Sequence, residues 1–185
     1  MGPWIAVVRD PIDHFLSAWA EIRFRKYQLR KIRKREKFRH PETEEWMSGD
    51  YDLRVRAFLH EVRQTIWPVK KRTEKTHANP QANFLMDENG EIYDNVQVVG
   101  DLSEMKTVLT KVGNFRQWTD NSTGRDSSLN EVKQQYFPRR PDLLSKLTLT
   151  ALCEFHEIDY FLFDFDPPIV CTEKGGPFAS WWGKV

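Results

Sequence analysis

The sequence lacks long hydrophobic runs and a strong charge of either sign. No segment approaches the roughly 20 apolar residues that cross a membrane, and no basic stretch precedes an apolar signal core. The 28 lysines and arginines nearly balance 27 acidic residues, so the formal net charge is +1. We therefore expect a soluble chain with no membrane segment of its own, and the even balance argues against a nucleic-acid binder.

Cysteine is also scarce. Cys153 and Cys171 are the only two cysteines, and they are too far apart in the sequence for a CxxC redox or zinc motif. They are either buried thiols or the two halves of one disulfide. The five histidines show no metal-ligand spacing, so no metal site is predicted.

The chain does contain enough apolar and aromatic material for one core. Hydrophobic residues make up 39% of the sequence, and they include 12 Phe, 7 Trp and 5 Tyr. A chain of 185 residues with this composition is long enough for one compact domain. We predict a single domain over residues 1–185, with residues 171–185 as a tail on its surface.

The first part of the chain predicts a strand followed by a helix. Residues 4–8 are a short apolar, β-branched run, and Asp10 stands where it can cap a helix that has Pro11 at its first position. The helix is expected to continue into a basic segment, residues 23–39, which holds ten lysines and arginines against one glutamate. Its apolar residues recur at helical spacing, at Ile12, Phe15, Leu16, Trp19 and Ile22.

The rest of the pattern predicts further helices and strands. In order, it indicates a helix with an apolar face at residues 55–66, strands at 82–86 and 96–99, helices at 102–112, 128–136 and 141–155, and a strand at 158–165. Strands that alternate with helices are typical of α/β layer folds. We therefore expect an α/β domain with a mainly parallel sheet.

One arginine stands where such a fold binds ligands. Open α/β sheets bind ligands beyond the carboxyl ends of their strands, where helix N-termini favour anions. Arg9 is placed at such a strand end and can hold a phosphate with two parallel donors, while Ser17 follows about two helical turns later. The alternative is structural: Arg9 pairs with a carboxylate and Ser17 is a small surface residue.

The segment RDPIDHFLSAW, residues 9–19, resembles a motif of a known family. It is similar to the 3′-phosphate-binding motif of sulfotransferases that use 3′-phosphoadenosine 5′-phosphosulfate (PAPS), especially the carbohydrate sulfotransferases of the Golgi. HANPQ (77–81), VVGDLSEM (98–105) and EIDYFLFDF (157–165) resemble further segments of that family in the same order, over roughly residues 5–168. The resemblance implies that Arg9 and Ser17 hold the 3′-phosphate of the donor.

The resemblance also implies a fold, a reaction and a compartment. The fold would be the three-layer, P-loop-NTPase-like α/β domain, and the reaction the metal-free transfer of a sulfuryl group from PAPS to a hydroxyl of a glycan or glycosaminoglycan such as chondroitin. The family acts in the Golgi lumen. The sequon at residues 121–123 would be glycosylated in such a secretory compartment.

One part of the family pattern is missing. The family carries a strand and a phosphate-binding loop for the 5′-phosphosulfate, and this sequence has no GxxxxGK[ST] or similar glycine-rich loop. The resemblance therefore predicts an N-terminally truncated form of the domain. The alternative from another class is a non-catalytic protein that binds a nucleotide or an anionic glycan.

Further residues are candidates for the same site. His77 is the candidate general base, because an imidazole has a suitable pKa, and its alternative role is to orient the substrate. His14 lies inside the donor motif and Arg125 in a polar loop at residues 118–128, so either residue could contact the nucleotide.

The basic segment supplies candidates for the acceptor. Arg30, Arg33 and Lys34 could attract an acidic carbohydrate, such as a sulfated or uronate-bearing glycan. A solvated helix face is an equally good interpretation of these charges. The third interpretation of the basic segment, an arm that binds nucleic acid, is the weakest of the three, because the chain as a whole carries almost no net charge.

Overall fold

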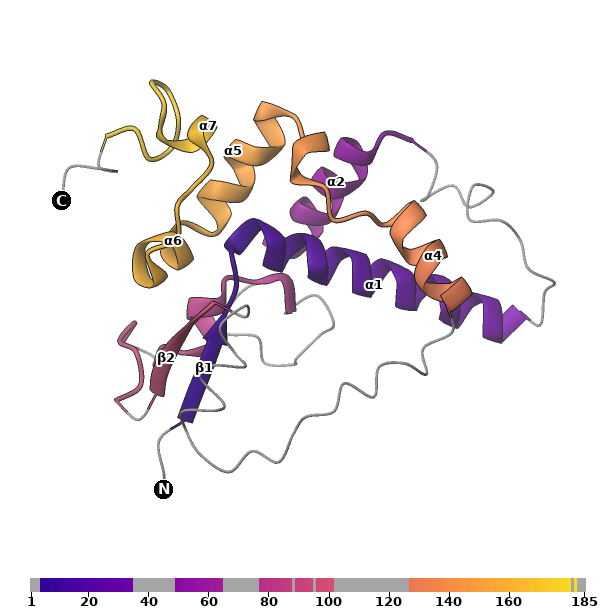
Figure 1. Ribbon diagram of the computed structural model, residues 1–185, viewed down its shortest axis with the longest axis horizontal. Coiled ribbons are helices and arrows are strands. Elements are labelled where there is room, and N and C mark those ends of the chain that lie inside the picture. Colours follow the sequence, from indigo (N-terminus) through magenta and orange to yellow (C-terminus); the bar gives the residue numbers. More distant parts are fainter. Residues whose placement is uncertain are drawn as a thin grey trace.

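A computed structural model describes residues 4–34, 49–64, 77–87, 89–94, 96–101, 127–180 and 182 (Figure 1). Its elements, in chain order, are β1 (Trp4–Val8), α1 (Pro11–Lys34), α2 (Tyr51–Arg63), the 3-10 helix η4 (Gln81–Phe84), β2 (Val96–Asp101), α4 (Ser127–Tyr136), the 3-10 helix η7 (Pro141–Leu143), α5 (Lys146–Phe155), α6 (Glu157–Phe163) and α7 (Ile169–Thr172).

The two predicted strands at residues 4–8 and 96–99 are confirmed. β1 and β2 lie side by side as a parallel pair at one end of α1, with Trp4 opposite Val96 and Ala6 opposite Val98 (Figure 1). A parallel pair requires a crossover connection between its strands, which agrees with the helices that separate them in the chain. The three-layer fold with a mainly parallel sheet stays a prediction.

Helix α1 begins as the sequence predicts. Asp10 accepts a hydrogen bond from the backbone N–H of Asp13 through Oδ1 at 2.9 Å, and Pro11 is the first helical residue. The helix then continues through the first part of the basic segment as far as Lys34, the last described residue of this stretch.

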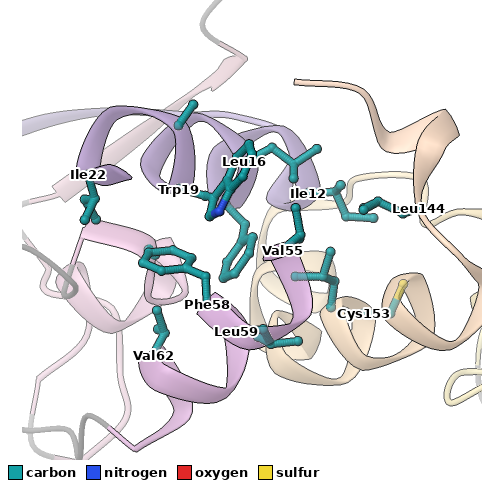
Figure 2. Packing of buried hydrophobic residues seen from close by; sticks show 14 of the residues in the cluster. Ile12, Leu16, Trp19, Ile22, Val55, Phe58, Leu59, Val62, Leu144 and Cys153 are labelled. Carbon is teal, nitrogen blue, oxygen red and sulfur yellow. The ribbon is translucent and has the colours of Figure 1, made fainter. Parts of the chain in front are cut away.

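The core lies between α1 and α2. The predicted apolar stripe of α1 faces Val55, Phe58, Leu59 and Val62 of α2, and all of these side chains are buried (Figure 2). Helix α2 starts at Tyr51, where Asp50 caps two backbone N–H groups. It ends at Arg63, three residues before the end of the predicted apolar face at residue 66.

A disulfide joins α5 to α7. Cys153 and Cys171 are both fully buried and bonded to each other, which decides between the two alternatives that the sequence left open. The bond closes a loop with a sequence separation of 18. By loop-closure entropy, a loop of this length stabilises the folded state by about 3 kcal/mol.

The predicted strand at residues 158–165 is wrong, because this segment forms α6. Asp159 and Tyr160 are neighbours in this helix, about 100° apart around its axis, and both are fully buried. His156 and Asp159, three residues apart, also meet at 2.9 Å, as helical spacing allows. The helix ends at Phe163, and the residue that follows it, Asp164, has a left-handed φ of 54°.

The predicted strand at residues 82–86 is also wrong. Residues 81–84 form η4, and only Met86 pairs with another extended residue, Ile92, in an isolated antiparallel bridge. The residues DENG at 87–90 predict a turn between these two positions, and the backbone N–H of Gly90 donates to the carbonyl of Asp87 as such a turn requires.

The predicted helix at residues 141–155 is divided into η7 and α5. Ser145 caps α5 by accepting a hydrogen bond from the backbone N–H of Thr148. The helical spacing of the apolar residues predicts Leu147 on the buried face of this helix, but its side chain is 62% exposed. The helix at 128–136 is confirmed as α4, and the one at 102–112 lies outside the described residues. Among the described helices, none is both long and apolar enough to span a membrane.

Two leucines of α2 provide a test of this packing. Leu59 is 2% exposed and Leu53 is 52% exposed on the same helix. Leu59→Ala should lower the free energy of unfolding by about 2–5 kcal/mol, because it removes buried methyl groups and leaves a cavity. Leu53→Ala should change it by less than about 0.5 kcal/mol. Equal losses in urea denaturation would contradict the placement of α2.

Candidate functional site

A cleft of about 720 Å³ lies beside the carboxyl end of β1 and the first half of α1. One wall comes from β1 and α1, and the other from residues 77–85. Its lining residues are Ala6, Val7, Val8, Arg9, His14, Ser17, Ala18, Glu21, Ile22, Arg25, His77, Gln81, Phe84 and Leu85. The cleft has the size of sites that bind small ligands, roughly 300–1,000 Å³.

Helix α1 lines this cleft because it has two different faces. His14, Ser17, Glu21 and Arg25 follow one another at steps of three or four residues, which places them on one side of a helix. Most of the predicted apolar stripe occupies the other side and packs into the core, while Ile22 belongs to the core and also lines the cleft. The same helix therefore forms both the core and one wall of the cleft.

The backbone of Arg9 is held from the opposite wall. The carboxamide of Gln81 accepts a hydrogen bond from the backbone N–H of Arg9 at 2.9 Å, and it donates to the carbonyl of Arg9 at 2.7 Å. These two reciprocal bonds fix the point at which β1 ends and the chain turns into α1. They also join the two walls of the cleft.

The side chains of Arg9 and Ser17 are available to a ligand. Within the described residues, the guanidinium of Arg9 has no ion pair or hydrogen bond, and the hydroxyl of Ser17 has no hydrogen bond. The structural alternative, in which Arg9 pairs with a carboxylate, is therefore not seen in this part of the chain. Both groups are half-buried in the cleft wall, where an unpaired cation favours an anionic ligand.

Glu21 differs from Arg9 because its charge is already neutralised. Lys133 of α4 and Arg25 contact its carboxylate at 2.5 and 2.7 Å. Burial acts to raise the pKa of Glu21, but the hydrogen bonds from Lys133 and Arg25 outweigh it and lower the pKa below the usual value. The carboxylate stays ionised, and its negative charge is balanced by Lys133 and Arg25. It therefore does not neutralise the positive charge of Arg9.

His14 is a neutral group beside these charges. Burial lowers the pKa of His14 to about 4, helped by the nearby ring of His156, although a hydrogen bond to the backbone of Asn79 acts in the opposite direction. The two imidazole rings meet edge to face, with 6.2 Å between their centroids. His14 therefore contributes no positive charge to the cleft near neutral pH.

His77 lies at the same cleft as Arg9, Ser17 and His14, although 60 residues separate it from Ser17 in the sequence. Its side chain is exposed, so it is accessible to a substrate. The structure thus brings four of the predicted site residues to one cleft. The roles of all four stay predictions.

The remaining predicted residues are not described at the cleft. Arg30, Arg33 and Lys34 lie on the last turns of α1, but their side chains are outside the described part of the structure. Arg125 and the sequon at 121–123 lie outside the described residues altogether.

Several lining residues were not predicted from the sequence. Glu21 and Arg25 stand four and eight residues after Ser17, so helical spacing from Ser17 was a usable signal for both. For Phe84 and Leu85 the sequence offers no comparable spacing, and the predicted strand at residues 82–86 gave them no place at a ligand site. Gln81 is the last residue of the HANPQ segment, which by itself indicates no role for its side chain.

A strand that leads into a helix, with an arginine at its end that has no partner among the described residues, is an arrangement that suits an anionic ligand. A scan against protein families matches residues 4–166 to the sulfotransferase family. The chain belongs to this family, whose chemistry is the transfer of a sulfuryl group. Searches of curated proteins and of solved structures found no match to the chain.

The depressed pKa of His14 can be measured. The unfolded chain binds a proton at His14 near pH 6.5, whereas the folded chain does so only near pH 4. Between these values the unfolded state holds more protons, so stability falls as the pH falls, by up to roughly 1.4 kcal/mol per unit. His14→Gln should flatten this slope in denaturation curves from pH 6.5 to 4. An unchanged slope would show that His14 titrates normally.

Proposed function

We propose that this protein is a sulfotransferase that takes its sulfuryl group from PAPS and transfers it to a hydroxyl of an acidic carbohydrate. The observation that carries the proposal is that the guanidinium of Arg9 and the hydroxyl of Ser17 line one cleft of about 720 Å³ and have no partner among the described residues. Both belong to the segment that resembles the 3′-phosphate motif, and the family match supports sulfuryl transfer in general.

The donor side of the proposal follows from charge and geometry. A phosphate monoester accepts two parallel hydrogen bonds from a guanidinium, and a serine hydroxyl can donate a third. The backbone of Arg9 is already fixed by Gln81, so less conformational entropy is lost when the ligand binds. In this proposal Arg9 and Ser17 hold the 3′-phosphate, and neutral His14 lies beside them as a contact to the nucleotide.

The transfer step is an in-line substitution at sulfur. The acceptor oxygen forms a new bond to sulfur while the bond from sulfur to the 5′-phosphate oxygen breaks, and adenosine 3′,5′-bisphosphate leaves with that electron pair. The proton of the acceptor hydroxyl passes to a base, for which exposed His77 is the candidate. Positioning and electrostatics supply most of the acceleration, as in phosphoryl transfer.

The acceptor side rests on the charge and shape of the other end of the cleft. Arg25 and Phe84 also line the cleft: Arg25 is exposed beside its partner Glu21, and Phe84 is 40% exposed, which suits a sugar ring with an acidic substituent. Arg30, Arg33 and Lys34 follow on the same helix, within the basic segment of the sequence. We propose a uronate-bearing or sulfated glycan as the acceptor.

The proposed place of action is the lumen of the Golgi. The disulfide between Cys153 and Cys171 supports this, because disulfides persist in oxidising compartments and are rare in the cytosol.

The donor assignment is tested by titrating the chain with adenosine 3′,5′-bisphosphate and with adenosine 5′-monophosphate. The wild-type chain should bind the bisphosphate at least tenfold more tightly. Arg9→Ala should remove this preference and Ser17→Ala should reduce it several-fold, because each variant loses a donor to the 3′-phosphate.

The matched control is Arg139→Ala, which removes an exposed arginine that does not line the cleft. It should keep the wild-type preference and so exclude a general charge effect. Wild-type affinity in a folded Arg9→Ala variant would refute the assignment.

The acceptor class is tested by transfer from sulfur-labelled PAPS. Labelled sulfate should appear on a uronate-bearing glycan and not on a tyrosine-containing peptide of similar charge. Transfer to the peptide alone would exclude a carbohydrate acceptor. Tight binding of the nucleotide with no transfer to any acceptor would favour a non-catalytic binding protein.

A further inference from the structure

Asp159 is a buried carboxylate that lies outside the cleft and yet connects to it. Its side chain is 0% exposed, and it stands on α6, which packs against η4. Both carboxylate oxygens accept hydrogen bonds from the start of η4: Oδ2 from the backbone N–H of Gln81 at 2.9 Å, and Oδ1 from that of Ala82 at 2.7 Å. Asp159 therefore caps η4 from a distance of 77 residues in the sequence.

The capped residue is the one that holds Arg9. The main chain of Gln81 binds Asp159, while its side chain binds the backbone of Arg9 through two hydrogen bonds. The bonds form a continuous chain from Asp159 through Gln81 to Arg9. No other described contact fixes the backbone of Arg9 from the facing wall of the cleft.

Asp159 is itself held in one orientation. The Nδ1 of His156, which is also fully buried, donates to its Oδ2 at 2.9 Å, so the carboxylate accepts three hydrogen bonds in all. The next residue, Tyr160, packs edge to face on Phe178 with 5.6 Å between ring centroids. These contacts leave the carboxylate little freedom to rotate.

We propose that Asp159 is a positioning residue for donor binding, which acts through Gln81 to set the position of Arg9. The inference rests on the proposed function, because it takes Arg9 as the residue that binds the 3′-phosphate. A phosphate held by two parallel bonds loses affinity when its guanidinium moves by a fraction of an ångström. A buried side chain that touches no ligand thus controls recognition of the 3′-phosphate.

The test compares the two nucleotides in variants of Asp159 and Gln81. Asp159→Asn keeps the size of the side chain but turns one acceptor into a donor that faces an N–H group. It should reduce the preference for adenosine 3′,5′-bisphosphate over the monophosphate about tenfold and leave the affinity for the monophosphate unchanged. Gln81→Ala should have a similar effect.

A double-mutant cycle separates positioning from a merely structural role. If Asp159 acts through Gln81, adding Asp159→Asn to Gln81→Ala should cause little further loss of the preference. The control Asp166→Asn changes an exposed aspartate in the chain that follows α6 and should leave the preference at the wild-type value. All affinities are measured well below the unfolding temperature of each variant.

The outcomes are distinct. A variant Asp159→Asn that unfolds at a lower temperature but keeps the full preference has only a structural defect and overturns the proposal. Additive losses in the double variant would also overturn it. If Asp159→Asn does not fold, Gln81→Ala decides, because an unchanged preference breaks the proposed connection. Absence of any preference in the wild-type chain would instead refute the proposed function.

Discussion

The burial of one face of α1 against α2 is the contact on which the rest of the described structure depends. Phe15, Leu16 and Trp19 are almost completely excluded from solvent, and their spacing fixes the rotation of the helix about its axis. Ser17 and Glu21 are thereby turned toward the opposite side, where the cleft lies. Any change that rotates α1 in the core would move the cleft wall by the same angle.

The charge that the cleft offers to a ligand depends on which of its charged side chains are already paired with each other. Glu21 is occupied by Lys133 and Arg25, whereas the guanidinium of Arg9 has no partner within the described residues. Burying a cation without a partner is costly, so this arrangement is stable when an anion completes it. The proposed 3′-phosphate meets that requirement, and the buried carboxylate of Asp159 holds the wall that faces it.

The elements predicted correctly are those whose signals are local. The apolar stripe of α1, the cap at Asp10 and the strands at residues 4–8 and 96–99 depend on neighbours in the sequence. The segments at 82–86 and 158–165 were misassigned as strands, because short apolar or aromatic runs carry no reliable period. Helix η4 is stabilised by a carboxylate 77 residues away, which no local pattern can reveal.

The sequence by itself determined the family and the two residues, Arg9 and Ser17, that are expected to bind an anion, because both lie within one short motif. Only the tertiary structure decided that His77 lines the same cleft as Arg9, that Gln81 binds the backbone of Arg9, that the two cysteines are bonded, and that Asp159 supports Gln81. The physical reason is distance along the chain. A hydrogen bond between residues more than 70 positions apart forms only where the packing of the helices brings them together.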